Sequence, residues 1–278
     1  MFAPTSRFEA EKRVSPPLPR SFGAIDLEFR NDAGISRAHR MYQAGMMRVR
    51  FPNVKGAPEA VLINTAGGLT GGDCVTMSVE MGAGTSAIVT SQAHEKVYKS
   101  SGGTVSMIAS LKLGEASSLE WLPQPTILFD RAILARETHV ELAGDADFLG
   151  VEAVIFGRTA MGEAMNNGAL SDHWTIRRDG RLIHADRFAL EGQVAAGLSK
   201  MSVLAGSAAM ATIRHVVIDA AAKLEAVREA LGEDGAASAW NGMLLARIVT
   251  KDGYGLSAAL ARTLTALRGR PLPPVWNI

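Results

Sequence analysis

The sequence VLINTAGGLTGGD, residues 61–73, joins a short apolar run to two glycine pairs and an aspartate. Paired glycines allow positive φ and close backbone approach, so this stretch predicts either a tight reversal or a place where another group lies against bare main chain. Directly after it, Val75, Met77 and Val79 alternate with polar residues, which is the period of a β-strand. The stretch therefore predicts two strands joined by a glycine-rich turn that ends in Asp73.

A phosphate-binding loop is the first chemical alternative, because Gly67 and Gly72 have the spacing of the outer glycines of a P-loop. That motif requires a lysine and a following helix, whereas this chain has Asp73 and a strand pattern. The stretch also contains no G-x-G-x-x-G run. Nucleotide binding is therefore not expected here.

Outward from this stretch, the period of two recurs at residues 25–29, 47–51, 105–113 and 140–142. Turn residues separate these runs at short, fairly even intervals, which predicts an all-β sandwich, barrel or solenoid. Residues 148–156 are apolar except for Gly150 and Glu152. Such a run is expected of a strand that is covered on both faces.

A hairpin is predicted at residues 174–185, where Asp179 and Gly180 supply a two-residue type I′ turn. In the register of that turn, Ile176 faces Ile183 on an apolar face.

Two helices are predicted near the C-terminus, where the apolar spacing changes from two to about four residues. They cover residues 217–231 and about 256–268, and residues 243–250 between them have the pattern of a strand. Gly232 and Gly269 follow the two helical patterns at the position where glycine ends helices.

Composition indicates an ordinary globular protein of 278 residues, 47% of them apolar, with 29 basic and 28 acidic side chains. A net charge near zero provides no field that attracts nucleic acid or an anionic membrane. The single Cys74 cannot form an internal disulfide, and the uncharged residues 201–213 are too short to span a bilayer. We expect a cytoplasmic protein with a loose segment at residues 1–20 and one domain at residues 21–278.

Candidate chemistry is sparse. Glu120 and Asp130 flank a proline-interrupted segment that must bend, so they could converge as a carboxylate pair in a β-rich hydrolase. His94 lies beside Glu95 and Lys96 in a dense polar cluster, but the six histidines lack the H-x-x-x-H or H-x-H spacing of a zinc or nickel site. A tight metal site is not expected, whereas weak carboxylate and water sites remain open.

Several spaced motifs together resemble the urease accessory protein family called UreD, or UreH in some organisms. They are NTAGGLTGGD at 64–73, QAHEKVYKS at 92–100, LEWLPQ at 119–124, Gly157-Arg158 with Met161-Gly162-Glu163, and Pro274-Val275-Trp276. The motif residues are Asn64, Gly67, Gly68, Gly71, Gly72, Lys96, Tyr98, Trp121, Pro123, Gln124, Gly157, Arg158, Gly162 and Trp276. The chain departs from the usual family pattern at Thr65, His94, Glu95 and Pro274, where Pro, Ala, Thr and Arg are more common.

The resemblance implies a mainly β, helically wound single domain with about two C-terminal helices and no enzymatic activity. It implies binding to apo-urease and cooperation with a UreF-like protein and a UreG-like GTPase, so that nickel in transit reaches the urease active site through an internal passage. No tightly bound cofactor is expected. The acids expected to line or flank the passage are Asp73, Glu120, Asp130 and Glu163, with Gln124 and Tyr98 as polar support.

Overall fold

The computed structural model describes residues 20–158 and 161–276, and most of their strands belong to two sheets. The smaller sheet has the order β15-β14-β11-β8-β5-β1-β2. Its strands are β1 (Phe22–Asp32), β2 (Ile35–Gly45), β5 (Cys74–Met81), β8 (Val105–Leu113), β11 (Ile133–Leu142), β14 (Gly168–Arg178) and β15 (Arg181–Gly192). The loose segment predicted at residues 1–20 lies outside the described residues, except for Arg20.

The larger sheet has the main order β17-β18-β16-β12-β9-β6-β4-β3, with the short strands β7, β10 and β13 attached beside it. Its strands are β3 (Met47–Arg50), β4 (Glu59–Asn64), β6 (Ser86–Ser91), β7 (Glu95–Val97), β9 (Ser118–Leu122), β10 (Thr126–Leu128), β12 (Asp147–Arg158), β13 (Glu163–Ala164), β16 (Ala209–Val216), β17 (Gly235–Trp240) and β18 (Met243–Thr250). Pro123 and Pro125 separate β9 from β10, as expected of residues that interrupt a ladder.

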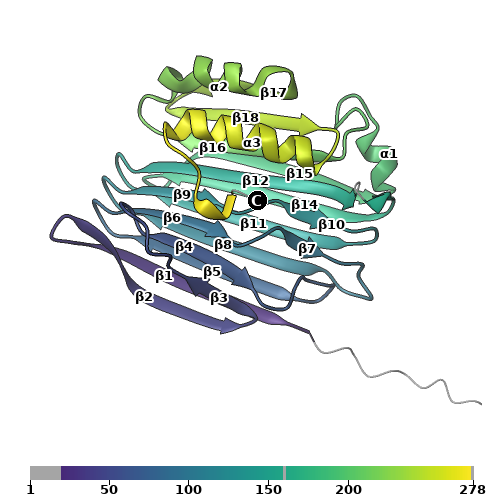
Figure 1. Ribbon diagram of the computed structural model, residues 1–278, viewed down its shortest axis with the longest axis horizontal. Coiled ribbons are helices and arrows are strands. Elements are labelled where there is room, and N and C mark those ends of the chain that lie inside the picture. The colour runs from purple at the N-terminus through teal and green to yellow at the C-terminus, as the bar shows by residue number, and fades with distance from the viewer. Residues whose placement is uncertain (1–19, 159–160, 277–278) are drawn as a thin grey trace, which may run out of the picture.

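The chain passes repeatedly from one sheet to the other, so each coil contributes strands to both. Within each sheet, strands from successive coils pair in parallel: β5 with β8, β8 with β11, and β11 with β14. The colour in Figure 1 changes steadily from strand to strand along this stack. Of the sandwich, barrel and solenoid that the sequence allowed, the solenoid is confirmed.

The strand β12 is covered on both faces, as its apolar run predicted. Phe148 and Phe156 point into the core between the sheets, whereas Leu149 and Ile155 point to the opposite face. The helices α2 (Leu224–Leu231) and α3 (Gly253–Arg268) cover that outer face (Figure 1).

Both predicted helices exist, with corrected starts. The first begins with a 3-10 turn at Ala220–Lys223 and not at residue 217, because β16 continues to Val216 and Val217 donates its N–H to Gly242. The second begins three residues earlier than predicted, at Gly253, because Asp252 caps it by accepting from the N–H of Gly255 at 2.8 Å. Short helical turns that were not predicted are α1 (Val194–Leu198), η3 (Gly232–Asp234) and η4 (Pro274–Trp276).

The predicted hairpin has the expected turn but a different register. Asp179 and Gly180 have φ of 50° and 76°, as a type I′ turn requires. The predicted pairing of Ile176 with Ile183 is wrong, because a β-bulge leaves Ile183 as an extra residue and pairs Ile176 with His184. The shift also places Asp186 opposite Trp174.

Candidate functional site

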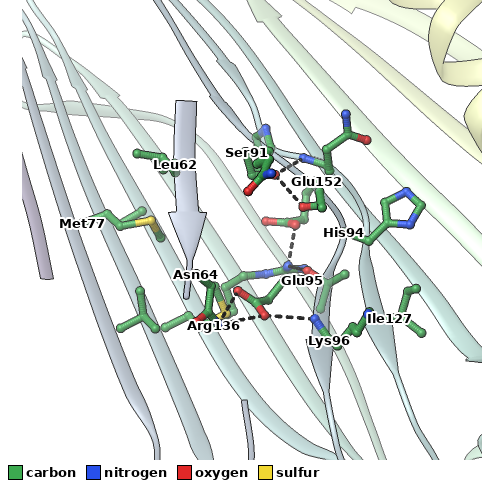
Figure 2. A pocket seen from close by; sticks show the side chains of 18 of the residues that line it. Leu62, Asn64, Met77, Ser91, His94, Glu95, Lys96, Ile127, Arg136 and Glu152 are labelled. Carbon is green, nitrogen blue, oxygen red and sulfur yellow. Dashed lines mark hydrogen bonds and ion pairs between the residues drawn. The ribbon is translucent and has the colours of Figure 1, made fainter. Parts of the chain in front are cut away.

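A cavity of about 440 Å³ lies between the two sheets. The smaller sheet lines it with residues such as Met77, Ala109 and Arg136, and the larger sheet with residues such as Leu62 and Glu152. Most of the lining is apolar, and a few charged side chains also reach the cavity (Figure 2). Concave, largely apolar spaces with a few convergent polar groups are the usual form of binding sites.

The cavity gathers motif residues that are far apart in the sequence. Those that line it are Asn64, Gly67, Gly68, Lys96, Trp121, Pro123, Gln124 and Trp276. The C-terminal segment is fixed against this wall, because Trp276 Nε1 donates to Thr90 Oγ1 at 3.1 Å and Gln124 Nε2 donates to the carbonyl of Val275 at 3.1 Å.

Of the remaining motif residues, Gly71, Gly72, Tyr98 and Gly162 lie outside the strands, whereas Gly157 and Arg158 end β12. The turns that lead from the larger sheet to the smaller one stack on each other. The N–H of Leu69 donates to the carbonyl of Lys96 at 2.7 Å, and the N–H of Phe129 donates to Val97 at 3.0 Å. Tyr98 and Phe129 stack at 4.8 Å between ring centroids, and Arg158 lies 4.7 Å over the Phe129 ring.

Position 68 requires glycine, because the backbone there lies against Lys96 and Tyr98. A Cβ on Gly68 would lie 2.9 Å from the carbonyl oxygen of Lys96 and 2.4 Å from the ring of Tyr98, and its φ of 147° is unfavourable for other residues. The close backbone approach expected of the glycine stretch is therefore confirmed.

The polar cluster at residues 94–96 reaches the same cavity. The carboxylate of Glu95 accepts from Asn64 Nδ2 at 3.1 Å and from the N–H of Lys96 at 3.0 Å. Burial raises the pKa of Glu95 and lowers that of His94. Figure 2 shows Glu95 directed toward Asn64, with the His94 ring on the other side of the strand.

A buried ion cluster contributes two side chains, those of Arg136 and Glu152, to the lining. Arg136 Nη1 lies 2.6 Å from Glu152 Oε1 and donates to Thr126 Oγ1 at 3.0 Å, while Nη2 lies 2.8 Å from Asp172 Oδ2. All three charged side chains are at least nine-tenths buried. Two carboxylates thus share one guanidinium away from water.

The pKa of Glu152 is raised to about 8, because burial and the neighbouring Asp172 carboxylate outweigh the opposing effect of Arg136. The short contact with Arg136 favours the ionised form, but a second buried carboxylate on the same guanidinium keeps one of the two acids protonated. Glu152 therefore carries a proton near neutral pH.

Glu152→Gln is expected to reduce the pH dependence of stability. Because the folded pKa of about 8 exceeds the ordinary value of 4.5, the folded state holds a proton that the unfolded state has lost between these limits. The free energy of unfolding then falls as pH rises through this window, by up to about 1.4 kcal/mol per pH unit. Urea unfolding at several pH values should show a flatter profile for Glu152→Gln, and the wild-type slope for Glu80→Gln at an exposed position of β5. A profile for Glu152→Gln as steep as that of the wild type would contradict the assignment.

Arg136 and Glu152 were not among the site residues predicted from the sequence. The available signal was Glu152 itself, an acid inside an apolar run, because a buried charge requires a partner. The partner could not be identified from the sequence, since Arg136 lies in the other sheet.

The four acids expected along the passage are held by protein groups. Asp73 accepts from the N–H of Ser21 at 2.7 Å and of Thr70 at 2.8 Å, so it closes the glycine-rich turn. Glu120 accepts from Arg268 and Arg270 at 2.9 Å each. In the described part of the chain, none of the four lines the cavity.

The structure brings Asp130 and Glu163 together. Glu163 pairs with Arg158 and accepts from the N–H of Asp130 at 3.3 Å, while Asp130 accepts from the N–H groups of Asn166 and Asn167. These contacts place both acids in the stacked turns, whereas Glu120 pairs with residues at the end of α3 and beyond.

The family model described as UreD urease accessory protein matches residues 21–277. The chain belongs to the UreD family. Among relatives named Urease accessory protein UreD, the chain is 46% identical to that of Agrobacterium fabrum over 88% of this chain and 87% of that protein. It is 48% identical to that of Rhizobium leguminosarum bv. trifolii over 88% and 91%, and 42% identical to that of Brucella suis over 96% and 98%.

Membership of the UreD family gives the chain a role in urease maturation as an accessory protein and not as an enzyme. The alternative hydrolase with Glu120 and Asp130 is therefore wrong. Among residues 20–158 and 161–276, no His, Cys, Asp and Glu side chains form a group of three or more that could hold a metal ion. No helix in these ranges is long and apolar enough to cross a membrane.

Proposed function

We propose that this UreD-family chain is a cytoplasmic scaffold that binds apo-urease and links it to a UreF-like protein and a UreG-like GTPase. We further propose that nickel in transit crosses its interior on the way to the urease active site. The observation that supports the proposed passage is the cavity between the sheets, which extends from motif residues such as Lys96 to the buried Glu152.

The chemistry of the lining suits transit better than storage. A route for a divalent cation must release what it binds, so isolated carboxylates, carbonyls and water serve better than a cage of imidazole or thiolate ligands. Glu95 supplies a single carboxylate in the lining, whereas Glu152 is paired with Arg136. No tightly bound cofactor is part of the proposal.

The four acids named from the sequence keep a flanking role in this proposal. Asp73 fixes the turn that contributes Gly67 and Gly68 to the cavity wall. Glu120 holds the segment that leads to Trp276, through Arg268 and Arg270.

Ala109→Phe should abolish most urease activation at limiting nickel while leaving partner binding intact. Ala109 is 3% exposed and lines the cavity, so a phenyl ring there occupies the proposed route. Activation would be measured after co-expression with urease and its accessory proteins, together with capture of apo-urease and the UreF-like protein.

Ser110→Phe is the matched control, because it adds the same ring to the other face of β8. If Ala109→Phe captured its partners and activated urease normally, the passage would be excluded and the scaffold role would remain. If the wild-type chain failed to capture apo-urease and the UreF-like protein, that result would contradict the scaffold role.

A further inference from the structure

The strand β2 forms an open edge of the smaller sheet. Among residues 20–158 and 161–276 it pairs only with β1. Figure 1 shows it at the lower end of the stack, opposite α2. An edge strand presents unpaired N–H and C=O groups, which are a template for a further strand. The 11 residues of β2 therefore expose a row of backbone groups along one side.

The register identifies the outward backbone groups of β2. The N–H of Met46, directly after β2, donates to the carbonyl of Phe22 at 2.9 Å, and this bond sets the alternation along the antiparallel pair. Every second residue bonds to β1, and the residues between direct their N–H and C=O groups to the free side. With the β-bulge between Glu28 and Phe29 taken into account, the outward residues of β2 are Ser36, Ala38, Met41 and Gln43.

The neighbouring edge strand of the larger sheet, β3, is closed by side chains. The N–H of Val49 donates to Gln43 Oε1 at 2.9 Å. Arg48 donates to the carbonyl of Met47 at 2.7 Å, and Arg50 donates to that of Val49 at 2.9 Å. These bonds occupy backbone groups of β3 that a further strand would need.

The two edges at the opposite end of the stack also differ from β2. The helix α2 packs against β17, and Arg228 donates to the carbonyl of Ala237 at 3.2 Å. The strand β15 carries one exposed large apolar side chain, Leu182, whereas β2 carries three. Those of β2 are Ile35, Met41 and Tyr42, with exposed fractions of 55%, 48% and 56%. Open backbone and apolar surface thus coincide at β2, as expected of a protein interaction site.

The surface around β2 is basic. Residues 35–50 contain four arginines, one histidine and no acidic residue. The side chains of Arg37 and Arg40 are 61% and 53% exposed, and such exposed arginines favour acidic partners. Pairing of β2 with a second copy of itself would bring four arginines from each copy together, and like charges on paired strands are destabilising. The charge therefore favours a different, acidic partner.

The two faces of β2 select different side chains in an added strand. Met41 pairs with the core residue Leu27, so it extends the apolar surface between the sheets. Arg40 pairs with Glu28 and lies on the other face. Because successive residues of a strand alternate between faces, a complementary segment has apolar residues alternating with acidic ones.

We propose that β2 is the docking edge for an extended segment of a partner protein in which acidic and apolar residues alternate. The segment pairs with β2 through main-chain hydrogen bonds and becomes an additional strand of the smaller sheet. Naming apo-urease and the UreF-like protein as the proteins that carry it rests on the proposed scaffold role, whereas nickel passage has no part in this inference.

Hydrogen–deuterium exchange of the purified full chain tests the pairing. In the complex with apo-urease and the UreF-like protein, the exchanging amides of residues 35–45 should slow at least roughly tenfold, while residues 181–192 of β15 keep their rates. Unchanged exchange in β2 would overturn the proposal. Protection of β2 in the isolated chain would also overturn it, and would assign the edge to a second copy if it grew with protein concentration and to residues 1–19 if it did not.

Met41→Pro blocks the edge in the same complex. It removes an outward N–H and leaves the ladder to β1 intact, and proline is tolerated on edge strands. Capture of apo-urease or of the UreF-like protein should weaken at least roughly tenfold, whereas Met41→Val, which keeps the N–H, should capture both normally. Equal capture by the two variants would exclude main-chain pairing at β2.

Charge reversal tests the acidic segment without changing the backbone. Arg37→Glu with Arg40→Glu should weaken capture at least roughly tenfold, and the matched control is Arg181→Glu with Arg187→Glu on the exposed edge of β15. Equal losses at the two edges would contradict recognition at β2. If every β2 variant captured both proteins normally, the scaffold role would remain and this inference alone would fail. If the wild-type chain captured neither protein, the scaffold role and this inference would fail together.

Discussion

Arg136→Leu is expected to lower the free energy of unfolding by about 3–5 kcal/mol, because removing one partner of a buried ion pair leaves uncompensated charge in the interior. The loss would leave Glu152 and Asp172 without the guanidinium that lies 2.6 Å and 2.8 Å from them. Urea unfolding at neutral pH measures the difference.

Two comparisons test that explanation. Arg247→Leu removes an arginine whose side chain is 52% exposed, and such surface pairs contribute only about 0–1 kcal/mol. Because Glu152 is protonated near neutral pH, combining Arg136→Leu with Asp172→Asn removes the stranded charge, so it should restore part of the loss. If Arg136→Leu cost no more than Arg247→Leu, the buried cluster would contribute no more to stability than an exposed ion pair.

Gly157→Ala is expected to destabilise the protein by about 2–4 kcal/mol, the sum of a left-handed backbone penalty and overpacking. Gly157 has φ of 88°, and an added Cβ would lie 2.4 Å from the carbonyl oxygen of Glu163 and 2.8 Å from Cα of Ala164. Both neighbours are backbone or backbone-bound atoms of β13, which pairs with β12 at this point. The strand must therefore move, and the contact between Arg158 and Glu163 moves with it.

Gly162→Ala is the matched control in the same motif. Gly162 has φ of 71°, but an added Cβ would meet no atom of residues 20–158 and 161–276 within 4 Å. Its expected cost is the backbone penalty alone, about 1–2 kcal/mol. Chemical unfolding of the two variants side by side gives the comparison, and equal losses would show that the close approach of β13 is not what requires glycine at residue 157.

The strands could be predicted from the sequence because alternation reports directly on which side chains share a face. The run at 148–156 even predicted a strand with two covered faces, and the structure places a core on each side of it. Alternation does not report which strands become neighbours, so sandwich, barrel and solenoid stayed equally open until the motifs suggested a wound domain. The predicted register of the hairpin was wrong for a related reason, since the alternation of apolar and polar residues does not reveal the β-bulge at Ile183.

The candidate site was predictable only in part. The motif residues do converge on one cavity, and several of them are far apart in the chain. The acids at loop ends were found, but the direction of their side chains could not be predicted, and backbone amides or arginines occupy Asp73, Glu120 and Asp130. Arg136 could not be recognised because its partners lie in other strands, one of them in the opposite sheet.

The stacking of the coils limits how wide the interior can become. Stacked sheets lie roughly 10 Å apart, and here covalent turns tie the strands of one sheet to those of the other in coil after coil. The two layers cannot separate like the halves of a hinged clamp, because these turns join them in every coil. In the proposed passage, movement depends on the rotation of individual side chains such as Arg136, and the layer spacing excludes a folded polypeptide segment.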